Sequence, residues 1–161
     1  MTAKHNIDEI PVLNKVALSE DGQFLYFIPS VAILGLFDDG QILLIEQYRP
    51  VVDKNTVELP GGKIEEGEDI ILAARRELLE ESGYSAESFE LIFSLDMDLS
   101  ASRHITHVVW AKLRDHIGHE EKTRVIILEL DQAIEMIVQG EITHAPTVAA
   151  LLWLNGKSDR V

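Results

Sequence analysis

Glu77, Glu80 and Glu81 lie within five positions of one another, in a segment whose apolar residues have helical spacing. On an α-helix, positions i, i+3 and i+4 share one face. Carboxylates at this spacing repel each other by roughly 0.2–0.5 kcal/mol per pair. Hard divalent cations such as Mg²⁺ and Mn²⁺ prefer oxygen ligands of this kind and remove the repulsion. Taken alone, the cluster indicates either a solvated acidic helix face or a metal site.

The residues before the cluster favour the metal site. Five residues separate Gly62 from Glu68, and seven more separate Glu68 from the sequence RELLEESGY, Arg76–Tyr84. This succession of a glycine, several acids, an arginine and a second glycine resembles the Nudix box at every fixed position. The box covers only 23 residues. The strands before it and the strand–helix–helix pattern after it also fit the family, so the resemblance spans most of the chain.

The resemblance implies a role for each matching position. It implies metal ligands of two kinds, side-chain carboxylates and one backbone carbonyl: Glu77, Glu80, Glu81 and Gly61. Gly62 lets the loop backbone approach the helix closely. Arg76 and Glu68 resemble residues that orient the carboxylates, and a plain ion pair between loop and helix is the alternative for both. Within the box, Glu81 and Arg76 are therefore our candidate catalytic residues.

Nudix enzymes hydrolyse a nucleoside diphosphate linked to another moiety, and the resemblance implies that reaction here. The negative oxygens of a pyrophosphate repel nucleophiles, and Mg²⁺, with Mn²⁺ as a substitute, would neutralise them and activate water. The chain has no cysteine and no GxSxG sequence, so a thiolate or serine-elbow nucleophile is excluded. We therefore expect direct attack by water.

Several segments resemble the ADP-ribose pyrophosphatase branch, which implies ADP-ribose as substrate and AMP and ribose 5-phosphate as products. The segment 45–50 ends in Arg49, and the segment before the box contains Glu58; together with Arg103 they are the candidate substrate-binding residues. Members often carry a proline about 16 residues after the box, whereas this chain has Leu99 and Ser100 there. The alternatives are GDP-mannose, an oxidised nucleoside triphosphate, a dinucleoside polyphosphate, or a non-catalytic nucleotide-sugar sensor.

The resemblance also implies a general base in the acidic loop before the last strand. Glu120 and Glu121 are the catalytic candidates there; the resemblance places Glu120 nearest to the base and implies that Glu121 is an outer metal ligand. His119 is a third option because its ordinary pKa of about 6.5 suits proton transfer near neutrality. His5, His107, His116 and His144 lack metal-ligand spacing and are interpreted as structural or surface residues.

These side chains require a scaffold of strands and helices. Apolar patterns predict strands over 12–19, 24–37, 41–50, 57–62, 89–97, 105–113 and 123–130. Residues 53–55 and 98–104 are predicted as loops. Helices are predicted from Asp69 to Gly83, over 131–140, and over 145–156 with Thr143 as its cap and Pro146 in its first turn. The predicted fold is α/β, a Nudix-type α/β/α sandwich with a central mixed sheet and a small N-terminal antiparallel sheet. Residues 1–30 are expected to form a hairpin region for dimerisation, and residues 31–161 the Nudix domain.

The composition limits the partners. The formal net charge of −14 over 161 residues opposes binding to nucleic acid or to anionic membranes. No apolar run reaches the roughly 20 residues needed to span a bilayer. The start of the sequence lacks the apolar core of a signal peptide, and the absence of cysteine is compatible with a reducing cytoplasm. We expect a cytoplasmic homodimer that binds a small nucleotide, with Trp110 and Trp153 in its core or interface and an adenine stack on one of them as a lesser alternative.

Overall fold

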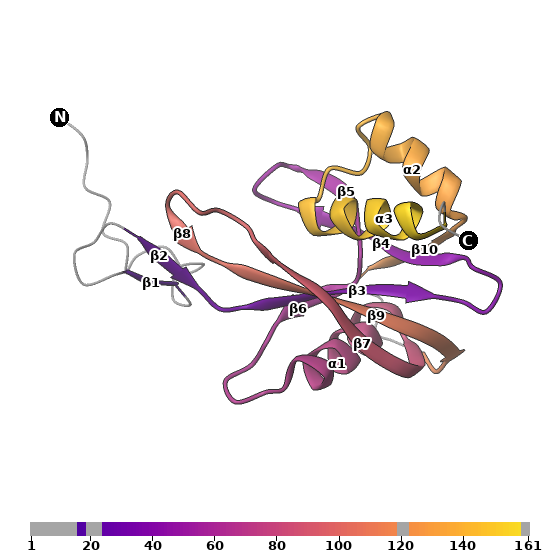
Figure 1. The fold of residues 1–161 in the computed structure, drawn as a ribbon, viewed down its shortest axis with the longest axis horizontal. Coiled ribbons are helices and arrows are strands. Elements are labelled where there is room, and N and C mark those ends of the chain that lie inside the picture. The colour runs from indigo at the N-terminus through magenta and orange to yellow at the C-terminus, as the bar shows by residue number, and fades with distance from the viewer. Residues whose placement is uncertain (1–15, 19–23, 119–122, 159–161) are drawn as a thin grey trace.

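The computed structural model describes residues 16–18, 24–118 and 123–158. Its elements follow in this order: β1 (Val16–Leu18), β2 (Leu25–Phe27), β3 (Ser30–Leu36), β4 (Ile42–Arg49), β5 (Lys54–Glu58), β6 (Gly61–Lys63), α1 (Ile70–Ser82), β7 (Tyr84–Asp96), β8 (Ser102–Arg103), β9 (Ile105–His116), β10 (Arg124–Leu128), α2 (Leu130–Val138) and α3 (Ala145–Ser158). Helix α1 covers one face of the central sheet, and α2 and α3 cover the other (Figure 1). The predicted α/β/α sandwich is confirmed.

Within the described residues the central sheet has the strand order β10-β4-β3-β9-β7, with β5 beside β4 and β6 beside β3. Strands β3 and β9 run parallel, and the other pairs run antiparallel, so the sheet is mixed as predicted. Strand β3 connects the sheet to the site because it pairs with β6, the strand that opens the box.

The apolar run of β3 fills two cores, one on each face of the sheet. Alternate residues of a strand point to opposite faces, and a strand covered on both sides is apolar throughout. Val31 and Ile33 pack toward α1, whereas Ala32 and Leu34 pack toward α2 and α3. All four are almost fully buried. The two cores hold the strand, and with it the box loop, between the helical layers.

Helix α1 begins and ends where the sequence predicts. The Asp69 side chain accepts a hydrogen bond from the N–H of Ile71 and caps the first turn. Gly83 adopts a left-handed conformation with φ of 72°, and its N–H donates to the carbonyl of Leu79. Because both ends of α1 are fixed, its carboxylates have a defined position relative to β6.

Several local predictions were wrong. Residues 54 and 55 belong to β5, because Arg49 pairs with Lys54 across a tight hairpin whose turn contains Asp53 at φ of 50°. Pro29 interrupts the predicted strand 24–37, since proline has no N–H for a ladder, and its carbonyl instead accepts from Ile64. Helix α3 begins at Ala145, so the residue before it is His144 rather than the predicted cap, Thr143.

The small sheet joins the N-terminal strands to a later part of the chain. Strands β1 and β2 pair antiparallel, as predicted, and β8 joins β2 in parallel from within the predicted loop 98–104. Because β8 directly precedes β9, this pairing brings residue 104 next to β2. None of the helices in the described ranges has the length and apolar character required to cross a bilayer.

Candidate active site

Gly62 lies directly against the Glu77 carboxylate, as the sequence predicts. A Cβ at Gly62 would stand 2.5 Å from Glu77 Oε2, far inside the 3.4 Å at which ordinary contact begins. The Gly62 backbone is not at positive φ, so close approach rather than conformation requires glycine here. A Cβ at Gly61 would overlap the backbone carbonyl of Val31 on β3. The two glycines therefore allow β6 to fit between β3 and α1.

Arg76 joins the box loop to the helix. Its Nε and Nη2 donate to the two carboxylate oxygens of Glu68, both at 2.9 Å, and Nη2 also donates to the carbonyl of Lys63 at 3.0 Å. Its Nη1 donates to Glu77 Oε1 at 2.7 Å and lies 3.6 Å from Glu80 Oε2. The hydrogen bonds from Arg76 lower the pKa of Glu68 to about 2. The planar guanidinium thus orients acids on both the loop and the helix.

The carboxylates of α1 differ in their surroundings. Burial raises the pKa of Glu81 to about 7, although its Oε2 accepts a hydrogen bond from the N–H of Gly61 at 2.8 Å. Burial also raises the pKa of Glu77, against the opposing effect of Arg76. The Glu80 side chain is 59% exposed. One buried acid, one half-buried acid and one exposed acid therefore line one helix face, and desolvation disfavours the charged form of the first two.

The donor set fits a hard divalent cation. The residues are carboxylates next to a loop carbonyl, which is the chemistry that Mg²⁺ and Mn²⁺ prefer. Because Gly62 has no Cβ, the Glu77 carboxylate can lie directly beside the loop. Among the described residues, no three acidic or histidine side chains are already arranged around a common point. Because Arg76 Nη1 lies 2.7 Å from Glu77 Oε1 and 3.6 Å from Glu80 Oε2, a cation bound by these acids would compete with the guanidinium for them.

Arg49 and Glu58 form a second charged group across the β4–β5 hairpin. Arg49 Nε donates to Glu58 Oε1 at 2.8 Å, and Nη2 donates to Oε2 at 2.6 Å. The Thr56 hydroxyl donates to the same Oε1 at 2.5 Å. Burial opposes ionisation of Glu58, but these hydrogen bonds outweigh it and hold the pKa of Glu58 below its usual value. The hydrogen bonds to Glu58 raise the pKa of Arg49, and the charge of the Glu81 carboxylate adds a smaller contribution in the same direction.

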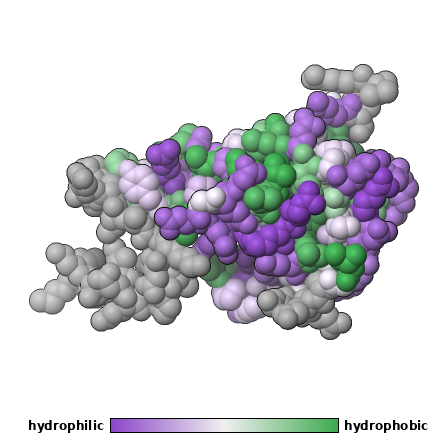
Figure 2. Space-filling model, turned by 90° about the horizontal axis from the view of Figure 1, so that it is seen from below, coloured by the Kyte–Doolittle hydropathy of each residue, from purple (hydrophilic) through white to green (hydrophobic). Residues whose placement is uncertain are grey.

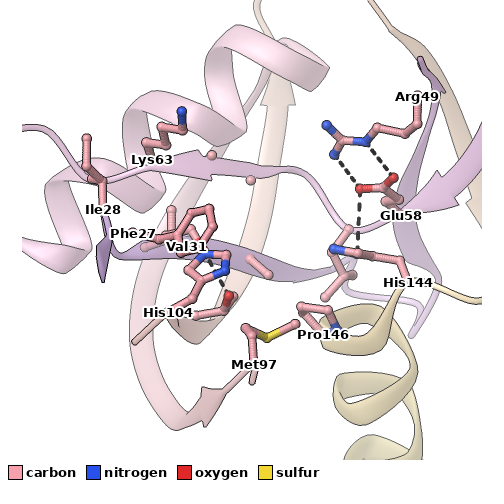
Figure 3. A pocket seen from close by; sticks show the side chains of 16 residues that line it. Phe27, Ile28, Val31, Arg49, Glu58, Lys63, Met97, His104, His144 and Pro146 are labelled. Carbon is pink, nitrogen blue, oxygen red and sulfur yellow. Dashed lines mark hydrogen bonds and ion pairs between the residues drawn. The ribbon is translucent and has the colours of Figure 1, made fainter. Parts of the chain in front are cut away.

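A cavity of about 270 Å³ is lined by the box loop and by the Arg49–Glu58 pair, whereas Glu77, Glu80 and Glu81 of α1 are not among its lining residues (Figure 3). Gly61 and Gly62 line it on the side of the box, and Arg49 and Glu58 line it beneath the hairpin. The opposite wall is aromatic, because the Phe27 and His104 rings stack with centroids 5.2 Å apart. His104 Nε2 also lies 3.4 Å from the Ser30 hydroxyl. The cavity therefore has cationic, polar and aromatic walls, as an elongated polar ligand with a planar group requires.

The structure brings some of the predicted residues to this cavity and leaves others away from it. Arg103 is exposed on β8 and does not line the cavity, although the adjacent His104 does. Glu120, Glu121 and His119 lie outside the described residues. Thr123, the first described residue after them, donates its hydroxyl hydrogen to the carbonyl of Glu81. The end of the predicted base loop is therefore adjacent to the last turn of α1.

Sequence reasoning missed His144, which we expected to be structural or on the surface. It lines the cavity beside Pro146, and its Nδ1 lies 3.6 Å from Glu58 Oε2. No local pattern marks it, because its partners come from β5 and from the first turn of α3. Trp153 packs against Phe93 with ring centroids 6.2 Å apart, which agrees with the expected core role.

The surface on the side of α1 is largely hydrophilic, with separate apolar patches between the polar regions (Figure 2). Two leucines of α1, Leu72 and Leu79, are exposed to solvent. A predominantly polar surface around the acidic helix agrees with the net charge of −14. An anionic ligand must therefore be attracted by local cations in the cavity rather than by the surface as a whole.

Comparisons with known proteins agree with this geometry. A family model described as NUDIX domain matches residues 27–151. The chain is 34% identical over 131 residues to the methanol dehydrogenase activator of Bacillus methanolicus, across 78% of this chain and 71% of that protein. It is 30% identical over 134 residues to an ADP-ribose pyrophosphatase of Bacillus subtilis, across 80% of this chain and 72% of that protein. A crystal structure of an ADP compounds hydrolase superposes with a TM-score of 0.71 at 23% identity, over 88% of this chain and 84% of that one, and shares the fold.

Proposed function

Since the chain belongs to the Nudix family of hydrolases, we propose that it cleaves the pyrophosphate bond of ADP-ribose to give AMP and ribose 5-phosphate. The observation that supports this is the cavity of about 270 Å³ between the box glycines and the Arg49–Glu58 pair. A pyrophosphate in this space would have the box glycines on one side, with the acids of α1 behind them, and the Arg49 guanidinium on the other. The names of relatives such as the Bacillus subtilis protein support an ADP-sugar as the substrate class.

We propose that the protein binds Mg²⁺, or Mn²⁺ in its place. The proposed ligands are four carboxylates and one backbone carbonyl: those of Glu77, Glu80, Glu81 and Glu121, and that of Gly61. A bound dication would neutralise the pyrophosphate oxygens and lower the pKa of water. Glu77 and Glu81 are suited to this role because desolvation raises the pKa of both, and a nearby cation would favour their charged forms. Arg76 holds the Glu77 carboxylate in place from the other side.

The chain's own side chains then place the substrate. Arg49, already aligned by Glu58, offers its guanidinium to a phosphate oxygen at the cavity. The stacked rings of Phe27 and His104 provide an apolar face for the adenine. Arg103 is exposed at the rim beside His104, where it would contact only the outer part of a bound nucleotide. Glu58 acts through Arg49, because its carboxylate oxygens are already bonded to Arg49 and Thr56.

Water attacks one phosphorus atom, and the bridging phosphorus–oxygen bond on that atom breaks. The proton of the attacking water passes to a carboxylate or imidazole of the loop 119–122, with Glu120 and Glu121 ahead of His119 as candidates. The displaced bridging oxygen leaves with the second phosphate. Each product therefore carries one phosphate, in agreement with AMP and ribose 5-phosphate.

We also propose a cytoplasmic homodimer, with residues 1–30 as the dimerisation region and residues 31–161 as the catalytic domain. The resemblance to the ADP-ribose pyrophosphatase branch is the basis of this proposal, and the pairing of β2 with β8 would connect such an interface to the wall of the cavity. Light scattering on the full chain would measure its mass. A monomer at all concentrations used in the activity assay would contradict the dimer.

The test is a substrate panel with product identification. The protein is incubated with Mg²⁺ and ADP-ribose, GDP-mannose, 8-oxo-dGTP or a diadenosine polyphosphate, and the products are separated by chromatography. We expect the highest kcat/KM for ADP-ribose and no turnover after chelation by EDTA, with recovery on adding Mg²⁺ or Mn²⁺. Faster turnover of GDP-mannose or of a triphosphate would reject the substrate, and activity in EDTA would reject the metal.

A further inference from the structure

Glu58 is only 3% exposed, and its carboxylate interacts with three side chains, those of Arg49, Thr56 and His144. Arg49 and Thr56 donate the three hydrogen bonds described above. His144 stands on another side, with Nδ1 at 3.6 Å from Oε2 (Figure 3). That separation is too long for a hydrogen bond but short enough for charge and dipole to interact. The orientation of Glu58 is therefore influenced by the ring of His144, the residue directly before α3.

His144 also contacts the residue that ties α3 to the loop before the box. Its Nδ1 lies 2.9 Å from Oγ1 of Thr147, which has no exposed surface. The same Oγ1 accepts a hydrogen bond from the N–H of Leu59 at 2.9 Å, across 88 positions of sequence. A hydroxyl group has two lone pairs and one proton, so it can serve Leu59 and the His144 ring together. His144 thus interacts electrostatically with Glu58, the last residue of β5, and is connected to the next residue, Leu59, through Thr147.

The neighbourhood of Nδ1 favours one tautomer of the ring. Without a proton, Nδ1 would accept a hydrogen bond from the Thr147 hydroxyl. Its lone pair would then also lie near the negative Glu58 carboxylate, which repels it. With a proton, Nδ1 donates to Thr147 Oγ1 and places the positive end of its N–H beside Glu58. Burial lowers the pKa of His144, which favours a neutral ring with a single proton. Glu58 therefore favours that proton on Nδ1.

We propose that His144 is a positioning residue whose Nδ1–H fixes Glu58 and thereby holds Arg49 in the orientation that receives the substrate. The inference rests on the proposed function for the role of Arg49. The Arg49 side chain is 44% exposed, and its order depends on the bidentate bond to Glu58. Because Arg49 would bind the ground state and the transition state alike, loss of its order raises KM more than it lowers kcat.

Three variants separate positioning from its alternatives. In His144→Asn, the amide nitrogen stands where Nδ1 stands in histidine, whereas in His144→Gln it stands where Nε2 stands. We expect His144→Asn to keep the wild-type KM, and His144→Gln and His144→Ala to raise KM by about 2- to 10-fold, which corresponds to one hydrogen bond. His107→Asn is the matched control, because His107 Nδ1 also faces a hydroxyl, that of Ser94 at 2.7 Å, but does not line the cavity.

Several outcomes would overturn the inference. Rescue by His144→Gln but not by His144→Asn would indicate a direct contact between Nε2 and substrate. Equal losses of kcat with lowered Tm in all three variants would indicate a merely structural residue. Unchanged KM in His144→Ala would remove the role altogether.

A readout besides activity separates this inference from the substrate assignment. Long-range ¹H–¹⁵N spectra show which ring nitrogen carries the proton, and the His144 signals are those missing in His144→Asn. We expect the proton on Nδ1, and a proton on Nε2 alone would overturn the inference. If the wild-type protein prefers another pyrophosphate over ADP-ribose, the substrate proposal fails, and the same variants on that substrate still decide the role of His144.

Discussion

Replacing Gly62 with alanine tests whether the position of the Glu77 carboxylate controls activity. The new Cβ would lie 2.5 Å from Glu77 Oε2, whereas ordinary contact begins at 3.4 Å, so the carboxylate must retreat by about 0.9 Å. Glu77 is nearly buried and its Oε1 is held by Arg76 at 2.7 Å, so it has little room to do so. The substitution therefore changes the site without removing any of its chemical groups.

The displacement gives an expected magnitude for each of two measurements. A misplacement of about 1 Å in a catalytic group can cost about 100-fold in rate. Overpacking of a well-packed site costs about 1–3 kcal/mol of unfolding free energy. At about 2–4 °C per kcal/mol for a domain of this size, Tm should fall by about 2–12 °C. We expect kcat/KM for the preferred substrate to fall by about 100-fold while the protein remains folded at 25 °C.

Two other glycines provide controls for the same chemical change. Gly156 lies in α3, and a Cβ there meets nothing within 4 Å. Gly156→Ala should keep full activity and stabilise the protein by up to about 1 kcal/mol, since alanine is the better helix former. In Gly61→Ala the Cβ would overlap the carbonyl of Val31, which is backbone and cannot move aside. That variant should lose most of its folded yield.

The comparison of Gly62→Ala with Gly156→Ala is decisive. If Gly62→Ala has the kcat/KM and Tm of the wild type, the carboxylate has another place to go and the close approach is not part of the site. If it loses stability by several kcal/mol with unchanged kcat/KM at 25 °C, Gly62 serves packing alone. Either result would refute the reasoning that connects this glycine to the acid beside it.

Three further predictions concern charge. Glu81→Gln should lower kcat by about 100-fold or more, because stabilisation by a bound cation is worth several kcal/mol. Its Tm should not fall, since a buried charge near Glu77 is removed; steady-state kinetics and calorimetry measure both, and near-normal kcat would reject the metal role. Arg49→Lys keeps the charge but loses the bidentate bond to Glu58, so KM should rise about 10-fold, or about 1.4 kcal/mol. The pKa of Glu58 is lowered in the folded state, so its ionisation adds stability above the unfolded pKa of about 4.3, and that stability is lost as pH falls through the lower folded pKa. The Tm difference between wild type and Glu58→Gln should therefore shrink as pH falls below about 4, and a difference independent of pH would contradict this.

The box and its helix could be predicted from sequence because their signals are local. Asp69 and Gly83 fix the helix ends through bonds to residues two and four positions away, and such bonds depend on residue type and spacing. The approach of Gly62 to Glu77 is different, because it brings a strand against a helix. We expected that approach from the resemblance of the box to the family pattern, whereas helical period and capping residues predicted the helix itself.

The other half of the site depends on contacts that no local pattern encodes. Thr147 bonds Leu59 from 88 positions away, and β8 reaches β2 from a segment that we predicted as a loop. His104 and His144 enter the cavity only because those long-range pairings form. The hairpin that aligns Arg49 with Glu58 was missed at residues 54 and 55 because polar side chains there do not resemble a strand.

Arg76 explains how a stable domain can carry three acids on one helix face. Its guanidinium lies 2.7 Å from Glu77 Oε1 and 3.6 Å from Glu80 Oε2, while its other edge is fixed to Glu68. The anchored arginine offsets part of the repulsion, but it carries one charge and does not contact Glu81 in the hydrogen bonds and ion pairs described. Glu81 instead relies on the N–H of Gly61 and keeps the least compensated charge of the three. A dication would therefore gain most at Glu81, next to the glycine carbonyl, and least at Glu80, which water already reaches. Removing Glu81 should on this reasoning weaken Mg²⁺ binding more than removing Glu80, and titration calorimetry of Glu81→Gln and Glu80→Gln with Mg²⁺ would show the reverse order if the argument fails.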